Sequence, residues 1–195
     1  VAILGLLGGF LTPILLSTGQ DNPAGLFGFI ALLDAGLIAV ALHRRWPHLI
    51  PLAMAGTVIM QLGWAAKFFE AAKAPVAVVI CLSLTALFYL ATEIARRWQR
   101  SSLHLSWSAA GLAVVAFGFA LFFQEYPSIA ARPGLLFSFV AISDLFLLAL
   151  AWRDERLKHL HVLAGGLAFA VLAIWTGRHL SDALLSWALV AYLGF

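Results

Sequence analysis

The sequence predicts an all-α fold, a polytopic transmembrane helical bundle of about eight helices. Hydrophobic residues make up 63% of the 195 residues, and charged residues only 11%, whereas soluble domains carry about 25% charged residues. Apolar runs recur along the whole chain at about the 20-residue length that a helix needs to cross the hydrocarbon. No period-two alternation persists within these runs, which argues against strands.

The first four runs are expected to form consecutive helices. They cover Val1–Ser17, Ala24–Leu42, Leu49–Phe69 and Pro75–Ile94. In the first run, Gly8 and Gly9 precede Pro13, and we predict a kink there because proline removes a backbone hydrogen bond. Such a break either lines a substrate path or serves helix packing. Asn22 or Asp21 can cap the second helix, which opens with a proline suited to a first turn.

The last four runs continue the same pattern. They cover Leu105–Phe123, Gly134–Trp152, His161–Gly177 and Ala183–Phe195. The last run is short for a crossing and is still apolar at its end, and the chain starts without Met. We therefore expect a fragment of a longer protein, whose other helices would be partners of this one.

Basic residues predict the orientation of the helices. Most of the 12 Lys and Arg residues lie in the second, fourth and sixth joints between runs, at Arg44–Arg45, Arg96–Arg100 and Arg153–Lys158. Positive joints face the cytoplasm, so we expect these joints and Val1 on that side. The basic charge therefore indicates membrane topology and a lipid bilayer as partner, not binding to nucleic acid. No residue pattern indicates a soluble partner.

An internal repeat is the second prediction about architecture. A shift of 110 residues superposes Asp34 on Asp144, and one inserted residue later Trp64 meets Trp175. We predict two four-helix units within one continuous membrane domain, residues 1–100 and 101–195, the second with a truncated last helix. Four helices per unit is an even number, so the copies are expected to be parallel repeats.

Three residues form the candidate intramembrane polar site: Asp34, Asp144 and Gln61. Each acid lies near the middle of its run, where a carboxylate is costly and usually faces the bundle interior. A proton-exchanging or cation-binding pair near the repeat axis is one interpretation. The alternative is an acid that bonds a backbone carbonyl or a nearby serine and only holds helices together. Gln61 could complete the polar site or bond another helix.

Four residues are candidate interfacial anchors: Trp64, Trp175, Arg96 and Arg97. The two tryptophans lie near the outer ends of their runs, and the arginines follow the fourth run. Aromatic and basic residues gather at membrane interfaces in this way. No catalytic motif is recognisable, and the six histidines and the single cysteine are too scattered to indicate a metal site. No cofactor is expected.

One segment resembles a known family. The residues that carry the likeness are Gly8–Gly19, Leu26–Phe27, Ala31–Gly36, Arg45–Trp46 and Gly63–Trp64. They resemble the very large predicted bacterial membrane proteins of the domain-of-unknown-function 2339 family, most strongly over Val1–Gln99. The resemblance implies an integral, multi-pass protein of the bacterial inner membrane with further helices and no assigned activity.

Three functions remain open from the sequence. Transport of a solute or lipid-linked intermediate predicts that Asp34 and Asp144 approach each other or a shared cavity. A non-catalytic scaffold or assembly subunit predicts that each acid is satisfied separately. A membrane-embedded enzyme acting on lipid-linked glycans would need a polar cluster at the outer face. Its candidate members are Asn22, Glu125, Arg132 and Asp182.

Overall fold

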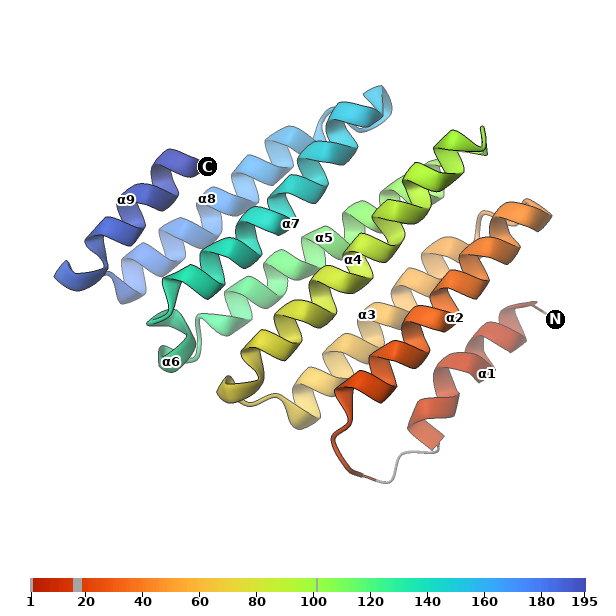
Figure 1. Ribbon diagram of the computed structural model, residues 1–195, viewed down its shortest axis with the longest axis horizontal. Coiled ribbons are helices and arrows are strands. Elements are labelled where there is room, and N and C mark those ends of the chain that lie inside the picture. The colour runs from red at the N-terminus through yellow and green to blue at the C-terminus, as the bar shows by residue number, and fades with distance from the viewer. Residues whose placement is uncertain (1, 16–18, 101) are drawn as a thin grey trace. The chain divides into compact units, whose positions relative to one another are not determined.

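The computed structural model describes residues 2–15, 19–100 and 102–195, and every regular element in these ranges is helical (Figure 1). The α-helices are α1 (Ala2–Leu15), α2 (Pro23–Arg44), α3 (Leu49–Phe68), α4 (Ala74–Arg97), α5 (Leu103–Phe123), α6 (Pro127–Ala130), α7 (Pro133–Arg153), α8 (Leu160–His179) and α9 (Leu185–Gly194). Three short 3-10 helices are η1 (Ala71–Lys73), η2 (Glu155–Leu157) and η3 (Asp182–Leu184). The predicted all-α bundle is confirmed. Val1 and residues 16–17, at the ends of the first predicted run, lie outside the described residues.

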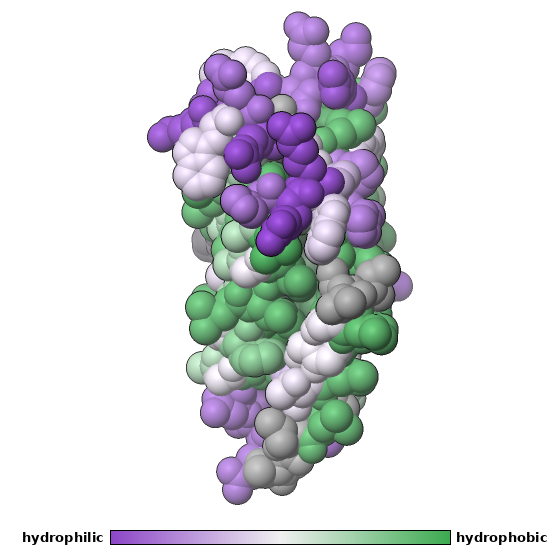
Figure 2. Space-filling view, turned by 90° about the vertical axis from the view of Figure 1, so that its right-hand side faces the viewer, coloured by the Kyte–Doolittle hydropathy of each residue, from purple (hydrophilic) through white to green (hydrophobic). Residues whose placement is uncertain are grey.

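Six of the described helices are long and apolar enough to cross a membrane: α2, α3, α4 together with η1, α5, α7 and α8. The other two apolar runs form shorter helices. The 14 residues of α1 rise about 21 Å and the 10 of α9 about 15 Å, short of a hydrocarbon layer of about 30 Å. On the face seen in Figure 2, hydrophobic residues form a band between hydrophilic ends, as the bilayer requires.

The chain divides into two compact units. Unit 1 contains Val1–Phe69 and Ser83–Leu112, and unit 2 contains Glu70–Leu82 and Ala113–Phe195. The division into repeats at residues 1–100 and 101–195 stays a prediction, and Ser101 lies outside the described residues.

Unit 1 is held together by close approach of α1 to the α2–α3 hairpin. A Cβ atom on Gly9 would lie 2.9 Å from Leu33 Cδ1, and one on Gly56 would lie 2.7 Å from the Phe10 ring. Small residues permit such contacts, on which membrane helices depend because apolar burial between helices gains little in lipid. Helix α1 continues through Pro13, and the kink predicted there with Gly8 and Gly9 stays a prediction.

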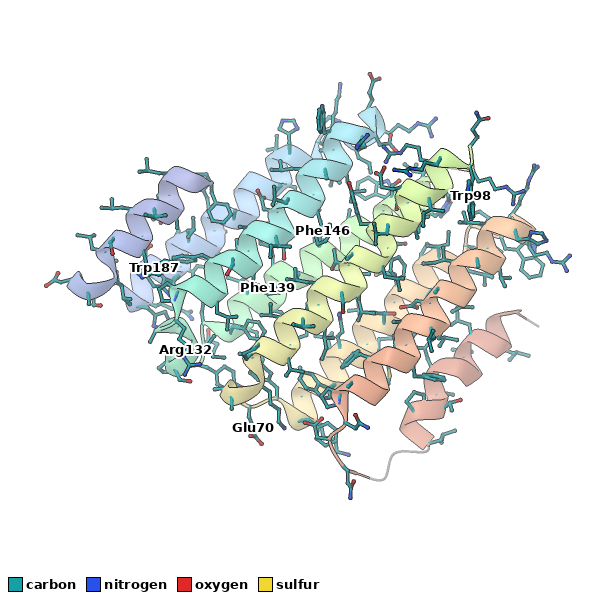
Figure 3. The ribbon with its side chains drawn as sticks, viewed as in Figure 1. Glu70, Trp98, Arg132, Phe139, Phe146 and Trp187 are labelled. Carbon is teal, nitrogen blue, oxygen red and sulfur yellow. The ribbon has the colours of Figure 1, made fainter. Side chains whose placement is uncertain are left out.

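Unit 2 packs aromatic rings around the α7–α8 hairpin. The rings of Phe137 on α7 and Trp175 on α8 meet edge to face, with centroids 4.9 Å apart. The ring of Phe139, labelled in Figure 3, packs in a tilted orientation against that of Phe123 of α5, with centroids 5.8 Å apart. A Cβ on Gly134 would lie 3.3 Å from the ring of Trp187, so glycine lets α9 approach the start of α7.

Candidate intramembrane polar site

Asp34 lies at the centre of the α2 stripe that faces the interior of unit 1. Its neighbours on this stripe are Ile30 and Ile38, one turn before and after it, and all three side chains are buried. Asp34 has no exposed surface. Its Oδ2 atom accepts a hydrogen bond of 2.6 Å from the Thr57 hydroxyl on α3. Asp34 is therefore a buried acid within unit 1, and its role in a functional site stays a prediction.

Gln61 lies one turn after Thr57 on the same buried face of α3. The Oε1 atom of Gln61 and the Oδ1 atom of Asp34 are both buried, and neither has a hydrogen-bond partner among the described residues. Asp34, Thr57 and Gln61 form what we call the polar site. It presents oxygen acceptors to the interior of an apolar bundle, where a proton, a cation or a donor group of a ligand can satisfy them.

Asp144 occupies a different environment on α7 in unit 2. Its side chain is half-buried, and its buried Oδ1 atom has no hydrogen-bond partner among the described residues. The neighbouring Ser143 is the residue that faces the interior, and its hydroxyl donates to the Phe139 carbonyl at 2.8 Å. The approach of Asp34 to Asp144 therefore stays a prediction, since the two acids belong to different units.

The α8 positions that the predicted repeat pairs with Thr57 and Gln61 are apolar. They hold Ala168 and Leu172, and both side chains are fully buried. Positions 168 and 172 of α8 therefore offer no hydroxyl or amide group to Asp144 of α7. Of the three residues predicted for the site, Asp34 and Gln61 lie in unit 1, and Asp144 lies in unit 2.

Trp64 and Trp175 are buried residues that connect each α-hairpin to the segment preceding it. Trp64 is 5% exposed and its Nε1–H donates to Asp21 Oδ1 at 2.8 Å. Trp175 is 0% exposed and donates to the Ala130 carbonyl at 3.0 Å. A role as interfacial anchors stays a prediction, and the structure adds a packing role for both indoles.

Arg96 and Arg97 end α4. Arg96 forms an ion pair of 3.0 Å with Glu93, one turn earlier, and Arg97 is exposed. Trp98 follows directly, is 68% exposed and lies at the end of the helix (Figure 3). The role of both arginines as interfacial anchors stays a prediction.

The residues considered for an outer-face enzyme site have structural partners in two cases. Asn22 caps α2 by accepting from the Gly25 N–H at 3.0 Å, which resolves the choice between Asn22 and Asp21 as cap. Glu125 pairs with Arg178 at 2.5 Å. Arg132 precedes α7 without a side-chain cap bond. Among the described residues no three His, Cys, Asp or Glu side chains come together as a set that could hold a metal.

From the sequence we did not assign Thr57 to the polar site, or Trp46 and Trp152 to the membrane interface. Thr57 precedes Gln61 by one helical turn, so the shared face was a usable signal. Trp46 is 42% and Trp152 88% exposed, and each adjoins an arginine in a joint, the usual composition of a membrane interface.

Comparison with protein families gives one finding that covers almost the whole chain. The family model described as a predicted membrane protein (DUF2339) matches residues 1–194, well beyond the segment that carries the motif likeness. Comparison with curated proteins and with solved structures finds no match. The chain therefore belongs to the DUF2339 family of predicted membrane proteins.

Proposed function

We propose that this member of the DUF2339 family helps to move a solute or a lipid-linked intermediate across a bacterial inner membrane, with the polar site as the place where cargo or a coupling ion binds. One observation supports this function above the others: Asp34 is fully buried on a membrane-spanning helix with only one of its two carboxyl oxygens paired.

The unpaired acceptors are the reason to expect a bound species. A buried polar group without a hydrogen bond costs about 1–3 kcal/mol in proteins, and more where no water can reach it. Asp34 Oδ1 and Gln61 Oε1 both carry this cost. A proton or cation that occupies the polar site during a transport cycle would remove it, which is why ionisable residues inside membranes so often line ion pathways.

A scaffold or assembly subunit is the second candidate. Such a protein needs its intramembrane polar groups paired within the bundle, and the Ser143 hydroxyl in unit 2 is paired in this way. The close glycine contacts of α1 also suit a packing role. The unpaired oxygens of Asp34 and Gln61 are our reason for preferring transport.

A membrane-embedded enzyme acting on lipid-linked glycans is the third candidate. It needs free polar groups at the outer face. Asn22 and Glu125, two of the four residues considered for it, are engaged in a helix cap and an ion pair.

Proton flux in liposomes tests the transport function. The full-length protein is reconstituted with a trapped pH-sensitive dye, and a potassium gradient with valinomycin drives proton uptake. We expect uptake faster than in protein-free liposomes, and Asp34→Asn should return the rate to the protein-free level. Asp144→Asn makes the same chemical change at a half-buried position and shows whether the second acid takes part. An unchanged rate in both variants, with folding checked by gel filtration, would remove transport from consideration.

A further inference from the structure

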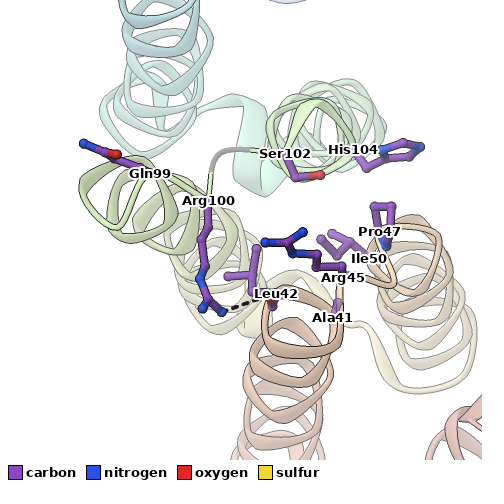
Figure 4. Close-up of a pocket in the computed structure, with 9 residues that line it drawn as sticks. All are labelled: Ala41, Leu42, Arg45, Pro47, Ile50, Gln99, Arg100, Ser102 and His104. Carbon is purple, nitrogen blue, oxygen red and sulfur yellow. Dashed lines mark hydrogen bonds between the residues drawn. The ribbon is translucent and has the colours of Figure 1, made fainter.

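A basic pocket lies at one end of unit 1, where the α2–α3 joint and the α4–α5 joint meet (Figure 4). Its volume is about 380 Å³. Arg45, Arg100 and His104 line it, and no Asp or Glu is among the described residues that do. Both joints belong to the set predicted to face the cytoplasm. We call this cavity the joint pocket, and its charge favours an anion.

Two helices end at the joint pocket in the same unusual way. The Trp46 N–H bonds the Ala41 carbonyl at 2.9 Å, and the Arg100 N–H bonds the Ala95 carbonyl at 2.8 Å. In each case the residue directly before the donor has a left-handed backbone. This residue is Arg45, with φ 56°, after α2 and Gln99, with φ 54°, after α4. Glycine is the usual residue there because a Cβ atom is sterically unfavourable in that conformation.

Arg45 is the left-handed residue whose side chain enters the joint pocket. Figure 4 shows Arg45 pointing between Arg100 and Ser102, whereas Gln99 points away. Arg100 is oriented by a hydrogen bond of 3.3 Å to the Leu42 carbonyl. The Arg45 guanidinium has no hydrogen bond or ion pair among the described residues. A guanidinium in this state offers a fork of donors that matches the oxygens of a phosphate group.

The surroundings of the pocket match the headgroup region of a bilayer. Trp46 and Trp98 follow the two helix ends and are 42% and 68% exposed, as aromatic residues at the lipid interface are. Apolar side chains, among them Leu42 and Ile50, also line the pocket. A phosphate in the pocket can therefore remain attached to acyl chains that lie along the membrane-facing helices.

We propose that the joint pocket binds the phosphate group of an anionic phospholipid, with Arg45 as its principal ligand and Arg100 as a second. The site is separate from the polar site, because no residue of either lines the other. It also stands without the transport function.

Lipid binding by native mass spectrometry tests this site. The full-length protein in a neutral detergent is titrated with phosphatidylglycerol or phosphatidylcholine. A hydrogen bond to a charged group contributes a factor of about ten or more to an affinity, so Arg45→Gln and Arg45→Gly should each weaken phosphatidylglycerol binding by about tenfold. Phosphatidylcholine, which has no net charge, should bind more weakly than phosphatidylglycerol to the wild type.

Arg44→Gln is the matched control, because it removes the same charge from the adjacent exposed residue, which does not line the pocket. Its affinity for phosphatidylglycerol should remain close to that of the wild type. Arg45→Gly places the preferred residue at a left-handed position, so its melting temperature should equal or exceed the wild-type value. Equal losses in Arg44→Gln and Arg45→Gly would overturn the site. Displacement of phosphatidylglycerol by millimolar inorganic phosphate would overturn its assignment to lipid.

Discussion

The α2–α3 hairpin of unit 1 and the α7–α8 hairpin of unit 2 are built alike but differ in the chemistry of their interiors. Both begin with a proline in the first turn, and in both a phenylalanine near that end meets a tryptophan of the second helix edge to face. The first hairpin buries Asp34, Thr57 and Gln61, whereas the corresponding positions of the second helix in the other hairpin bury Ala168 and Leu172.

The contrast indicates that a hairpin of this kind packs without the polar side chains of Thr57 and Gln61. The α7–α8 hairpin packs with Ala168 and Leu172 at the positions of Thr57 and Gln61 and with its acid only half-buried, so the fully buried acid of the α2–α3 hairpin is not needed to form such a pair. A costly group that is unnecessary for packing is expected to have a function. The two hairpins can therefore serve as controls for each other.

Both hairpins contain a buried tryptophan that packs against a phenylalanine, and removal of this tryptophan should destabilise the protein most. Trp175→Ala removes a fully buried ring and the hydrogen bond to the Ala130 carbonyl, so we expect a loss of about 3–5 kcal/mol in the free energy of unfolding. Trp64→Ala should also destabilise the protein, by a similar or slightly smaller amount, because Trp64 is 5% exposed. Unfolding in sodium dodecyl sulfate followed by circular dichroism measures both. Trp152→Ala, at 88% exposure, is the control and should change stability little.

The next prediction concerns two substitutions that exchange a polar and an apolar residue between the interiors of the two hairpins. Leu172→Gln places an amide in a fully buried apolar position without a planned partner, which should cost about 1–3 kcal/mol. The reverse change, Gln61→Leu, removes an oxygen that has no partner and should be neutral or stabilising. The same unfolding measurement compares them. If Gln61→Leu lowered the free energy of unfolding more than Leu172→Gln does, the Gln61 amide would be part of the packing of unit 1.

The smallest effect concerns a single hydrogen bond. Thr57→Val keeps the shape of the side chain and removes the donor to Asp34, so we expect a loss of about 1 kcal/mol, in the range measured for hydrogen bonds between membrane helices. Thr57→Ser retains the hydroxyl and should lose less. Ser143→Ala removes a bond within one helix and serves as the comparison in unit 2. No difference between the valine and serine variants would mean that the Asp34–Thr57 bond adds nothing to stability.

Much of this architecture could be predicted because the bilayer imposes a length on each apolar run. The starts of α2 and α7 were within one residue of prediction, since a proline in the first turn marks both and Asn22 caps the first. The rotation of each helix about its axis was harder to predict. Almost every residue of α7 is apolar, so periodicity did not reveal that Ser143, and not Asp144, faces the interior. Thr57 could have been predicted, because it lies one helical turn before Gln61 and therefore on the same face of α3.

The hydrogen bond from Trp175 to the Ala130 carbonyl also constrains the order of assembly during synthesis. The donor follows the acceptor by 45 residues, and the whole of α7 lies between them. The Ala130 carbonyl at the end of α6 therefore cannot accept this hydrogen bond until most of α8 has been synthesised.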